Sequence, residues 1–234
     1  MKNLIFSLLV IVSSLSANKI YATFDVEASK SASVAFSSSG IIDKVFVDIG
    51  SVVKQGDKLA VLDNKDTRAV LNIHKTTLKF AKKDFERQKK IRKIIDQAKF
   101  DSYVNKYESA KAQVAYQKTL LDKTILKAPF DGIVISKEIE SGDVVSGQMI
   151  RTAFKIQSKI KRKLVLQFDQ KYHTIVKVGD KFKYKLDGDT TTYTGTIAKV
   201  YPYADTKTRK IKAEVLTQSF IVGLFGDGYI TTSK

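Results

Sequence analysis

The sequence predicts a mainly β protein that is interrupted once by an α-helical coiled-coil hairpin. Three observations indicate this fold class. All 12 glycines of the 234-residue chain lie outside residues 65–127, a stretch that also lacks proline and is therefore predicted to be helical. Short runs of Val, Ile, Leu and Phe, separated by glycines, lie on both sides of this stretch and are typical of β-strands. The two segments that flank it also repeat each other, which predicts two halves of one small β domain.

The composition limits the function classes. With 43% hydrophobic residues, the chain can bury a core. The absence of cysteine excludes thiol catalysis, disulfides and Cys-ligated metals. His74 and His173 stand far apart and lack the spacing of a metal-binding pair. We therefore expect no cofactor and no metal site.

Residues 1–22 are predicted to be a secretory signal peptide. Lys2 supplies a positive charge, and residues 4–15 form an apolar run that is shorter than the ~20 residues of a membrane span. Ala17 and Ala22 offer cleavage sites, so we expect export to the periplasm, with an uncleaved anchor as the alternative. Export argues against nucleic acid as a partner, despite the net charge of +17.

The periodicity divides the rest of the chain into four parts. Residues 23–63 are expected to form leading strands and the first half of the repeat, and residues 64–127 the helical hairpin. Residues 128–158 are expected to form the second half of the repeat, and residues 159–234 a further β domain.

The helical stretch has the alternating 3 and 4 spacing of a coiled-coil seam. The seam weakens near residues 92–99, where a short turn would let the second helix run back along the first. The predicted seam residues are Leu71, His74, Leu78, Ala81, Phe85 and Gln88 in the first helix, and Phe100, Tyr103, Tyr107, Ala110, Val114, Gln117, Leu121 and Thr124 in the second.

The hairpin is strongly basic. Residues 64–127 contain 17 Lys and Arg against 7 Asp and Glu, which accounts for +10 of the net charge. One interpretation is a solvated coiled-coil exterior. The other is attraction to an acidic partner, for which the argument is that Lys and Arg pairs cluster toward the turn, at 82–83, 89–90 and 92–93.

The repeat aligns GIIDKVFVDIGSVVKQGDKL, residues 40–59, with GIVISKEIESGDVVSGQMI, residues 132–150. We interpret its glycines as tight turns or close strand approaches, and its alternating Val and Ile as the inner face of a small sandwich. Because each half is too small to bury its own face, the halves are expected to pair. The predicted fold-defining turn residues are Gly40, Gly50, Gly56, Pro129, Gly132 and Gly142.

Together these features resemble the HlyD-like membrane fusion proteins, over about residues 23–230. The segment KAPFDGIV at 127–134 is similar to the family's return from the hairpin into its second lipoyl half-motif. The resemblance implies a flattened lipoyl/biotinyl-like barrel split by the hairpin, then a small β-barrel domain. Family members often continue into a membrane-proximal domain, which we expect to be absent or vestigial here. The residues similar to the family's β-barrel pattern are Gly179, Gly195, Pro202, Asp205 and Arg209.

The same resemblance implies a periplasmic adaptor that bridges an inner-membrane RND-type efflux transporter and a TolC-like outer-membrane channel for the export of small molecules. It also implies a homo-oligomeric ring, a trimer or a hexamer, held at the inner membrane through its partners. The hairpin tip is the implied channel contact, with Lys89, Lys90, Ile91, Arg92 and Asp96.

Other function classes fit the sequence less well. The hairpin replaces the joint where a carrier domain has its modified lysine. Asp131, Asp143 and Asp205 lie in Gly- or Pro-flanked turns, where aspartate caps backbone N–H groups, so no enzyme is expected. The alternatives are a type I secretion adaptor, a metal-efflux adaptor, and a basic coiled-coil protein on anionic membrane surfaces. Met1 and Met149 are too few for a methionine cluster that captures copper or silver.

Overall fold

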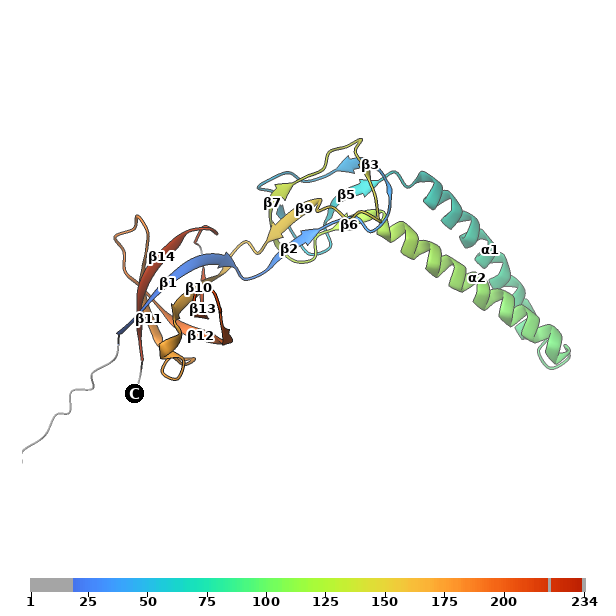
Figure 1. Ribbon diagram of the computed structural model, residues 1–234. Helices are drawn as coiled ribbons and strands as arrows, with labels where there is room; N and C mark the ends of the chain where they lie inside the picture. Colours follow the sequence, from blue (N-terminus) through green and yellow to red (C-terminus); the bar gives the residue numbers. More distant parts are fainter. Residues whose placement is uncertain (1–18, 219, 233–234) are drawn as a thin grey trace, which may run out of the picture. The chain divides into compact units, whose positions relative to one another are not determined.

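The computed structural model describes residues 19–218 and 220–232, so most of the predicted signal peptide lies outside the described residues. The chain divides into two compact units. Figure 1 shows their helices and strands, coloured by residue number. One unit is Lys30–Lys159, and the other combines the segments before and after it. Within the described part of the chain, no helix has the length and apolar character needed to cross a membrane.

The unit of residues 30–159 contains two four-stranded sheets and the helical hairpin. The sheets have the strand orders β2-β9-β7-β4 and β6-β5-β3-β8. Their strands are β2 (Ser31–Val34), β3 (Gly40–Val45), β4 (Val52–Val53), β5 (Lys58–Leu62), β6 (Ile125–Lys127), β7 (Gly132–Lys137), β8 (Val144–Val145) and β9 (Phe154–Gln157). Both sheets contribute to one core, in which Leu59, Phe154 and Ile156 are fully buried. The predicted sandwich is therefore confirmed.

The two halves of the repeat exchange strands. β4 of the first half pairs with β7 of the second, and β8 of the second half pairs with β3 of the first. The Gly50 N–H donates to the Val134 carbonyl and the Gly142 N–H donates to the Ile42 carbonyl, both at 2.8 Å. Each half thus completes the sheet of the other, which is why neither half buries its apolar face alone.

The hairpin consists of α1 (Lys65–Lys90) and α2 (Gln97–Lys123), which lie side by side in Figure 1. Every predicted seam residue is buried or half-buried. Phe85 of α1 stacks on Tyr107 of α2 with ring centroids 5.2 Å apart. At the base, the buried Asn64 side chain donates to the Thr124 hydroxyl at 2.9 Å. The coiled-coil hairpin is therefore confirmed as predicted.

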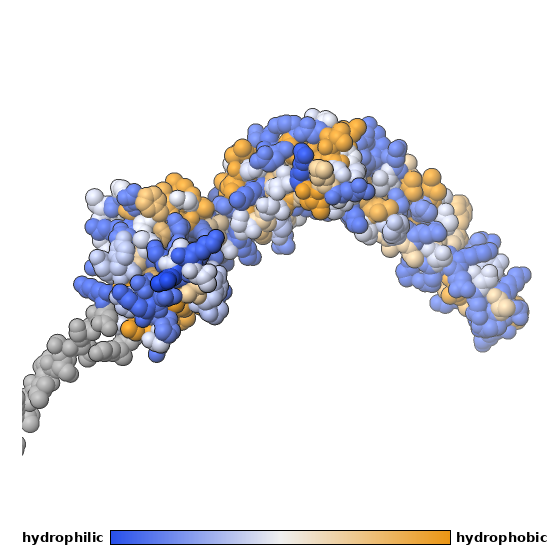
Figure 2. Space-filling view, viewed as in Figure 1, coloured by the Kyte–Doolittle hydropathy of each residue, from blue (hydrophilic) through white to orange (hydrophobic). Residues whose placement is uncertain are grey.

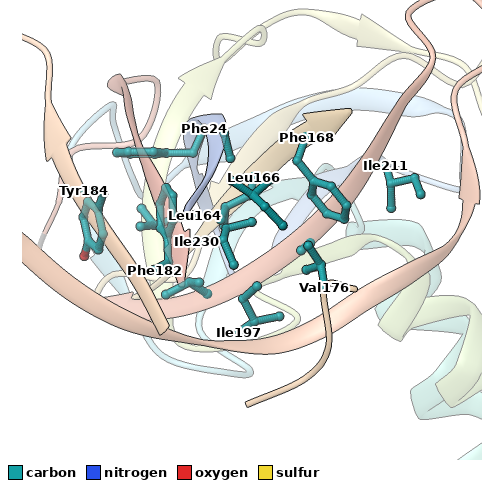
Figure 3. Close-up of a cluster of buried hydrophobic side chains, with 14 of the residues drawn as sticks. Phe24, Leu164, Leu166, Phe168, Val176, Phe182, Tyr184, Ile197, Ile211 and Ile230 are labelled. Atoms are coloured by element: carbon teal, nitrogen blue, oxygen red, sulfur yellow. The ribbon is translucent and has the colours of Figure 1, made fainter. Parts of the chain in front are cut away.

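The other unit is a closed barrel with the strand order β1-β10-β13-β12-β11-β14. Its strands are β1 (Lys19–Ala28), β10 (Lys161–Asp169), β11 (Lys181–Leu186), β12 (Tyr193–Ala204), β13 (Lys210–Gln218) and β14 (Phe225–Thr231), with the short 3-10 helix η1 (Gln170–Tyr172) after β10. Alternate residues of β1, β11 and β14 point inward. Figure 3 shows Phe24, Leu166, Phe182 and Ile197 meeting in the barrel core, where all four are fully buried.

The structure differs from the predicted domain division at the start of the chain. The predicted barrel domain begins at residue 159, whereas β1 also belongs to the barrel and pairs with both β10 and β14. Residues 19–22, predicted to end the signal peptide, begin this strand, and Ile20 and Ala22 are only 1% exposed. Residues 159–234 supply five of the six strands, so the barrel closes only when β1 fills the gap between β10 and β14.

Candidate functional site

The hairpin tip, residues 89–96, is held by its own backbone. The Ile94 N–H donates to the Ile91 carbonyl at 3.0 Å, which closes a turn directly after α1. Asp96 begins α2 as its N-cap, because its carboxylate accepts the Lys99 N–H at 3.0 Å. These hydrogen bonds satisfy backbone groups that a helix end leaves unpaired, so they fix the shape of the tip.

Two basic side chains of the tip rest on aromatic rings of the seam. The Arg92 guanidinium lies 4.6 Å from the centroid of the Phe100 ring, and the Lys89 Nζ lies 5.9 Å from that of Phe85. The attraction of a cation to an aromatic face keeps Arg92 half-buried. Lys90, in contrast, is exposed and makes no ion pair or ring contact within the described residues. Of Lys89, Lys90 and Arg92, Lys90 is therefore the residue whose charge is most available to a partner.

The tip also presents an apolar side chain that the sequence analysis did not single out. Ile94 is 83% exposed. Figure 2 shows hydrophilic residues gathered over this end of the hairpin, so Ile94 is an apolar knob among charged neighbours. The signal was present in the sequence, because three isoleucines fall within residues 91–95, at the predicted turn. Ile91 is also exposed, by 43%, so the tip presents two isoleucines among charged residues.

The structure brings the five predicted contact residues together at the tip. Lys89 and Lys90 end α1, Ile91 and Arg92 begin the turn, and Asp96 caps α2. Asp96 has a structural role, because its carboxylate accepts the backbone N–H of Lys99. The remaining four, together with Ile94, form the surface that could meet a partner.

The turns of the repeat share one pattern, x-x-Gly-Asp. In residues 54–57 and 140–143, the aspartate carboxylate accepts the N–H of the residue three positions earlier at 2.8 Å. Gly56 and Gly142 have φ values of +89° and +95°, which only glycine adopts readily. Among the other predicted turn residues, Gly50 also has a positive φ, Pro129 lies between β6 and β7, and Gly40 and Gly132 begin β3 and β7.

Asp205 and Arg209, two of the residues named from the family's β-barrel pattern, lie in the turn between β12 and β13. The Asp205 carboxylate accepts the N–H groups of Thr208 and Lys207 at 2.8 and 2.9 Å. The hydrogen bond from Thr208 and then that from Lys207 lower the pKa of the Asp205 carboxyl below its usual range. Arg209 has a positive φ of 55° and donates its N–H to the Asp205 carbonyl at 2.7 Å. Asp205 and Arg209 thus shape the turn.

The remaining barrel residues named from the sequence also act as turn and packing residues. Gly179 lies in a third x-x-Gly-Asp turn, at residues 177–180, and Gly195 packs against Val215. Pro202 lies in β12 where its register against β13 shifts, between Val200 and Ala204.

A groove that the sequence did not predict lies at this shift. It has a volume of about 580 Å³ and is lined by Tyr201, Pro202 and Tyr203 of β12, together with Lys171 and His173, which lie within and directly after η1. The groove combines aromatic faces with basic groups, which suits contact with another protein surface. Its existence depends on strand register, which no local pattern encodes.

A charged cluster crosses the outside of the barrel. The Lys163 Nζ lies 2.7 Å from the Glu214 carboxylate and 3.7 Å from that of Glu27. The Tyr201 hydroxyl donates to Glu214 at 2.7 Å. Burial alone would raise the pKa of the Glu214 carboxyl, but the hydrogen bonds from Lys163 and Tyr201 outweigh it and hold that pKa below its usual range. The hydrogen bond to Glu214 in turn raises the pKa of Lys163.

The three aspartates considered for catalysis all cap backbone. Asp131 accepts the Gln55 N–H at 2.8 Å, Asp143 accepts the Glu140 N–H at 2.8 Å, and Asp205 holds the turn described above. Among residues 19–218 and 220–232, no group of three or more His, Cys, Asp or Glu side chains could hold a metal ion.

Known proteins share both the sequence pattern and the fold. A family described as CzcB-like, barrel-sandwich hybrid domain matches residues 30–156, more than half of the chain. The cobalt-zinc-cadmium resistance protein CzcB of Cupriavidus metallidurans is 28% identical over 203 residues, which cover 80% of this chain and 39% of that protein. This chain therefore spans less than half the length of that curated relative.

Two solved structures have the same architecture. A MacA-MexA chimeric protein that contains the Pseudomonas aeruginosa MexA α-hairpin domain matches with a TM-score of 0.84 at 23% identity, covering 93% of this chain and 83% of that chain. MacA from Actinobacillus actinomycetemcomitans matches with a TM-score of 0.76 at 22% identity, covering 93% of this chain and 79% of that chain. Both likenesses concern the fold.

Proposed function

This chain belongs to the CzcB-like barrel-sandwich hybrid family of membrane fusion proteins, and from that membership we propose that it is the periplasmic adaptor of a tripartite efflux pump. In this role it bridges an inner-membrane RND-type transporter and a TolC-like outer-membrane channel. It is exported by its N-terminal signal, stays at the inner membrane through its partners, and assembles into a ring. In this role it catalyses no reaction. Small molecules leave the cell through the assembled pump.

The observation that carries the proposal is the helical hairpin inserted between the two halves of the sandwich. Helices of 26 and 27 residues, at about 1.5 Å per residue, give an arm roughly 40 Å long. The aromatic seam and the Asn64–Thr124 hydrogen bond stiffen this arm at both ends. A stiff arm with a charged, apolar-centred tip is suited to reaching a distant partner.

We assign the channel contact to the hairpin tip. Lys89, Lys90 and Arg92 would meet acidic groups at a channel mouth, while Ile91 and Ile94 would fill apolar recesses. Charges at the rim of an interface mainly tune association rate and salt dependence, and a central apolar anchor supplies most of the affinity. Asp96 contributes by holding the turn in shape.

The tip is tested by the double variant Lys90→Glu with Ile94→Ser, in a strain that lacks the native protein. Both side chains are exposed, so the melting temperature should change little. Resistance in a drug-susceptibility assay should be lost, and crosslinking to the channel should disappear while crosslinking to the transporter persists. Lys90 is preferred to Arg92 because reversing Arg92 would also remove its contact with Phe100.

Lys79→Glu is the matched control, because it makes the same charge change at an exposed position of α1 away from the tip. It should retain both crosslinks and full resistance. If the tip variant also retains full resistance, or loses both crosslinks together, the placement of the channel contact is wrong.

A second candidate cargo is a divalent metal cation. It is favoured by the relative whose name describes cobalt, zinc and cadmium resistance. The adaptor role is the same for either cargo. Deleting the gene and measuring growth on graded zinc, cobalt and cadmium salts, beside a panel of drugs, separates the two: metal efflux predicts sensitivity to the salts alone.

A further inference from the structure

One end of the barrel holds the start of its first strand and the end of its last. Lys19, where β1 begins, pairs with Thr231, where β14 ends. Because neighbouring strands of the barrel run antiparallel, β10 and β12 also end here, and β11 and β13 begin here. Figure 1 shows the blue start of β1 beside the red end of β14. We call this end, with its connections at residues 170–180 and 205–209, the terminal end of the barrel.

The connection at residues 170–180 lies across the terminal end, because one of its side chains is fixed inside the barrel. Val176 is 4% exposed, and Figure 3 shows it among the core side chains. Residues close to it in the chain face outward, since Ile175 and Val178 are 37% and 64% exposed. Tyr203, next to the last residue of β12, is 60% exposed. The terminal end therefore presents apolar surface to its surroundings.

The terminal end is also basic. Residues 169–181 and 205–210 contain six Lys and Arg against three Asp. Each aspartate accepts a backbone N–H, in turns that begin at residues 169, 177 and 205. The basic side chains, in contrast, make no ion pair within the described residues. Five of them are exposed, namely Lys171, Lys177, Lys181, Lys207 and Arg209.

This combination of groups matches a bilayer that contains anionic phospholipid. Lysine and arginine are attracted to the negative surface of such a bilayer, and tyrosine favours the layer between headgroups and acyl chains, where its ring is in apolar surroundings and its hydroxyl in water. The groove beside η1 adds a recess of about 580 Å³, lined by Lys171, His173 and Tyr203 among others. A headgroup phosphate in this recess would have basic partners.

The predicted signal peptide favours a lipid surface over an acidic protein surface as the partner of this end. Its apolar run, residues 4–15, is separated from β1 only by residues 16–18. Three residues span at most about 11 Å. While that run is in the membrane, during export or as an uncleaved anchor, the terminal end is therefore held next to the bilayer.

We propose that the terminal end of the barrel binds anionic phospholipid directly. Lys171, Lys177 and Lys207 would lie at the headgroup phosphates, and Val178 and Tyr203 in the layer beneath them. The inference goes beyond the proposed function, which holds the chain at the membrane through its partners alone. Such a contact would turn the terminal end toward the membrane and keep the chain there when no transporter is bound.

Tryptophan fluorescence tests which part of the molecule enters the lipid, because the natural chain contains no tryptophan. The protein used is the chain beginning at Lys19, which contains every described strand and helix, so the signal peptide cannot itself bind vesicles. In Tyr203→Trp, vesicles of equal parts phosphatidylcholine and phosphatidylglycerol should shift the emission to the blue, and brominated lipid should quench it. Phosphatidylcholine alone should do neither. Tyr116→Trp is the matched control, the same substitution at a 66% exposed position of α2, and its emission should not change.

Charge reversal provides the second measurement. Lys177→Glu with Lys207→Glu should lower the partition coefficient onto the anionic vesicles, measured by co-sedimentation, by about tenfold or more. Both side chains are exposed, and only their backbone N–H groups hold the turns, so the melting temperature should change little. Lys79→Glu with Lys118→Glu makes the same charge change at exposed positions of the hairpin. This control should lower the coefficient by less than about threefold, because charges far from the contact are screened by salt.

An emission that stays unchanged in Tyr203→Trp overturns the inference and leaves an acidic protein surface as the partner of this end. An equal shift in Tyr116→Trp, or an equal loss in the hairpin variant, overturns it in favour of adsorption through the hairpin or through the net charge of +17. These assays contain only protein and lipid. A chain that binds lipid through the barrel but supports no efflux therefore overturns the adaptor proposal and leaves the lipid contact standing.

Discussion

Several aspartates of this chain hold turns. In the x-x-Gly-Asp turns at 54–57, 140–143 and 177–180, the aspartate carboxylate accepts the N–H of the residue three positions earlier at 2.8 Å. The pattern recurs in both units, although their folds differ. In these three turns the aspartate caps the backbone, which accounts for Asp57, Asp143 and Asp180 without acid–base chemistry.

Glu214→Gln tests the cluster on the outside of the barrel. The variant should lose about 1 to 3 kcal/mol of unfolding free energy at neutral pH, because Lys163 and Tyr201 lose a charged partner. The pKa of Glu214 is lowered in the folded state, so its stabilisation is present above the usual glutamate range and is lost as the pH falls through the folded pKa. The gap between the variant and the natural chain should therefore narrow in acid.

Urea unfolding followed by circular dichroism at pH 7 and pH 4 measures this gap. Asp187→Asn is the control, since it neutralises an exposed carboxylate of the same barrel. A gap that is equal at the two pH values would contradict the assignment.

At the scale of elements, the helices were predictable because their signal is local. The seam spacing places the turn near residues 92–99, and the structure has it between Lys90 and Gln97. Val70, Ile73, Thr77 and Phe80 of α1 have the same spacing as the seam, but they are exposed, because each helix of a two-helix hairpin packs against the other through one face only. The β12 groove was not predictable, because it lies at the register shift against β13.

Tyr107→Asp should open the hairpin. It places a charge against Phe85 in the seam, at a cost of several kcal/mol, and helix content measured by circular dichroism should fall while the β signal persists. Tyr116→Asp is the matched control, being the same substitution on the exposed side of the same helix. Equal helix content in the two variants would show that Tyr107 does not support the seam.

At the scale of the whole molecule, the sequence repeat was enough to predict the sandwich. It did not predict that β1 belongs to the barrel. Its partners β10 and β14 lie more than a hundred residues away in the sequence. The alternation of apolar and polar residues predicts which side of a strand is buried, but not which strands it pairs with. The position of the tip residues in the sequence could be predicted. The stacking of Arg92 on Phe100 could not, because it depends on the conformation of the turn.

The position of β1 refines the predicted cleavage of the signal peptide. Cleavage after Ala22 would remove Ile20 and Ala22 from the barrel core, so we expect the mature chain to begin at or before Lys19. Intact-mass measurement of the exported protein decides this. A mass that corresponds to a chain beginning at Thr23 would contradict it, and Ile20→Asp should destabilise the mature barrel by several kcal/mol.

The pairing of Lys19 with Thr231 also sets the order of folding. Every strand of the sandwich lies within residues 30–159, so that unit can complete its sheets before the last strands of the barrel have been synthesised. The barrel must wait for β14, the last of its strands to emerge, and ordering so long an intervening chain makes its closure slow. During that delay β1 presents an unpaired, apolar edge, the state in which strands aggregate or are bound by chaperones.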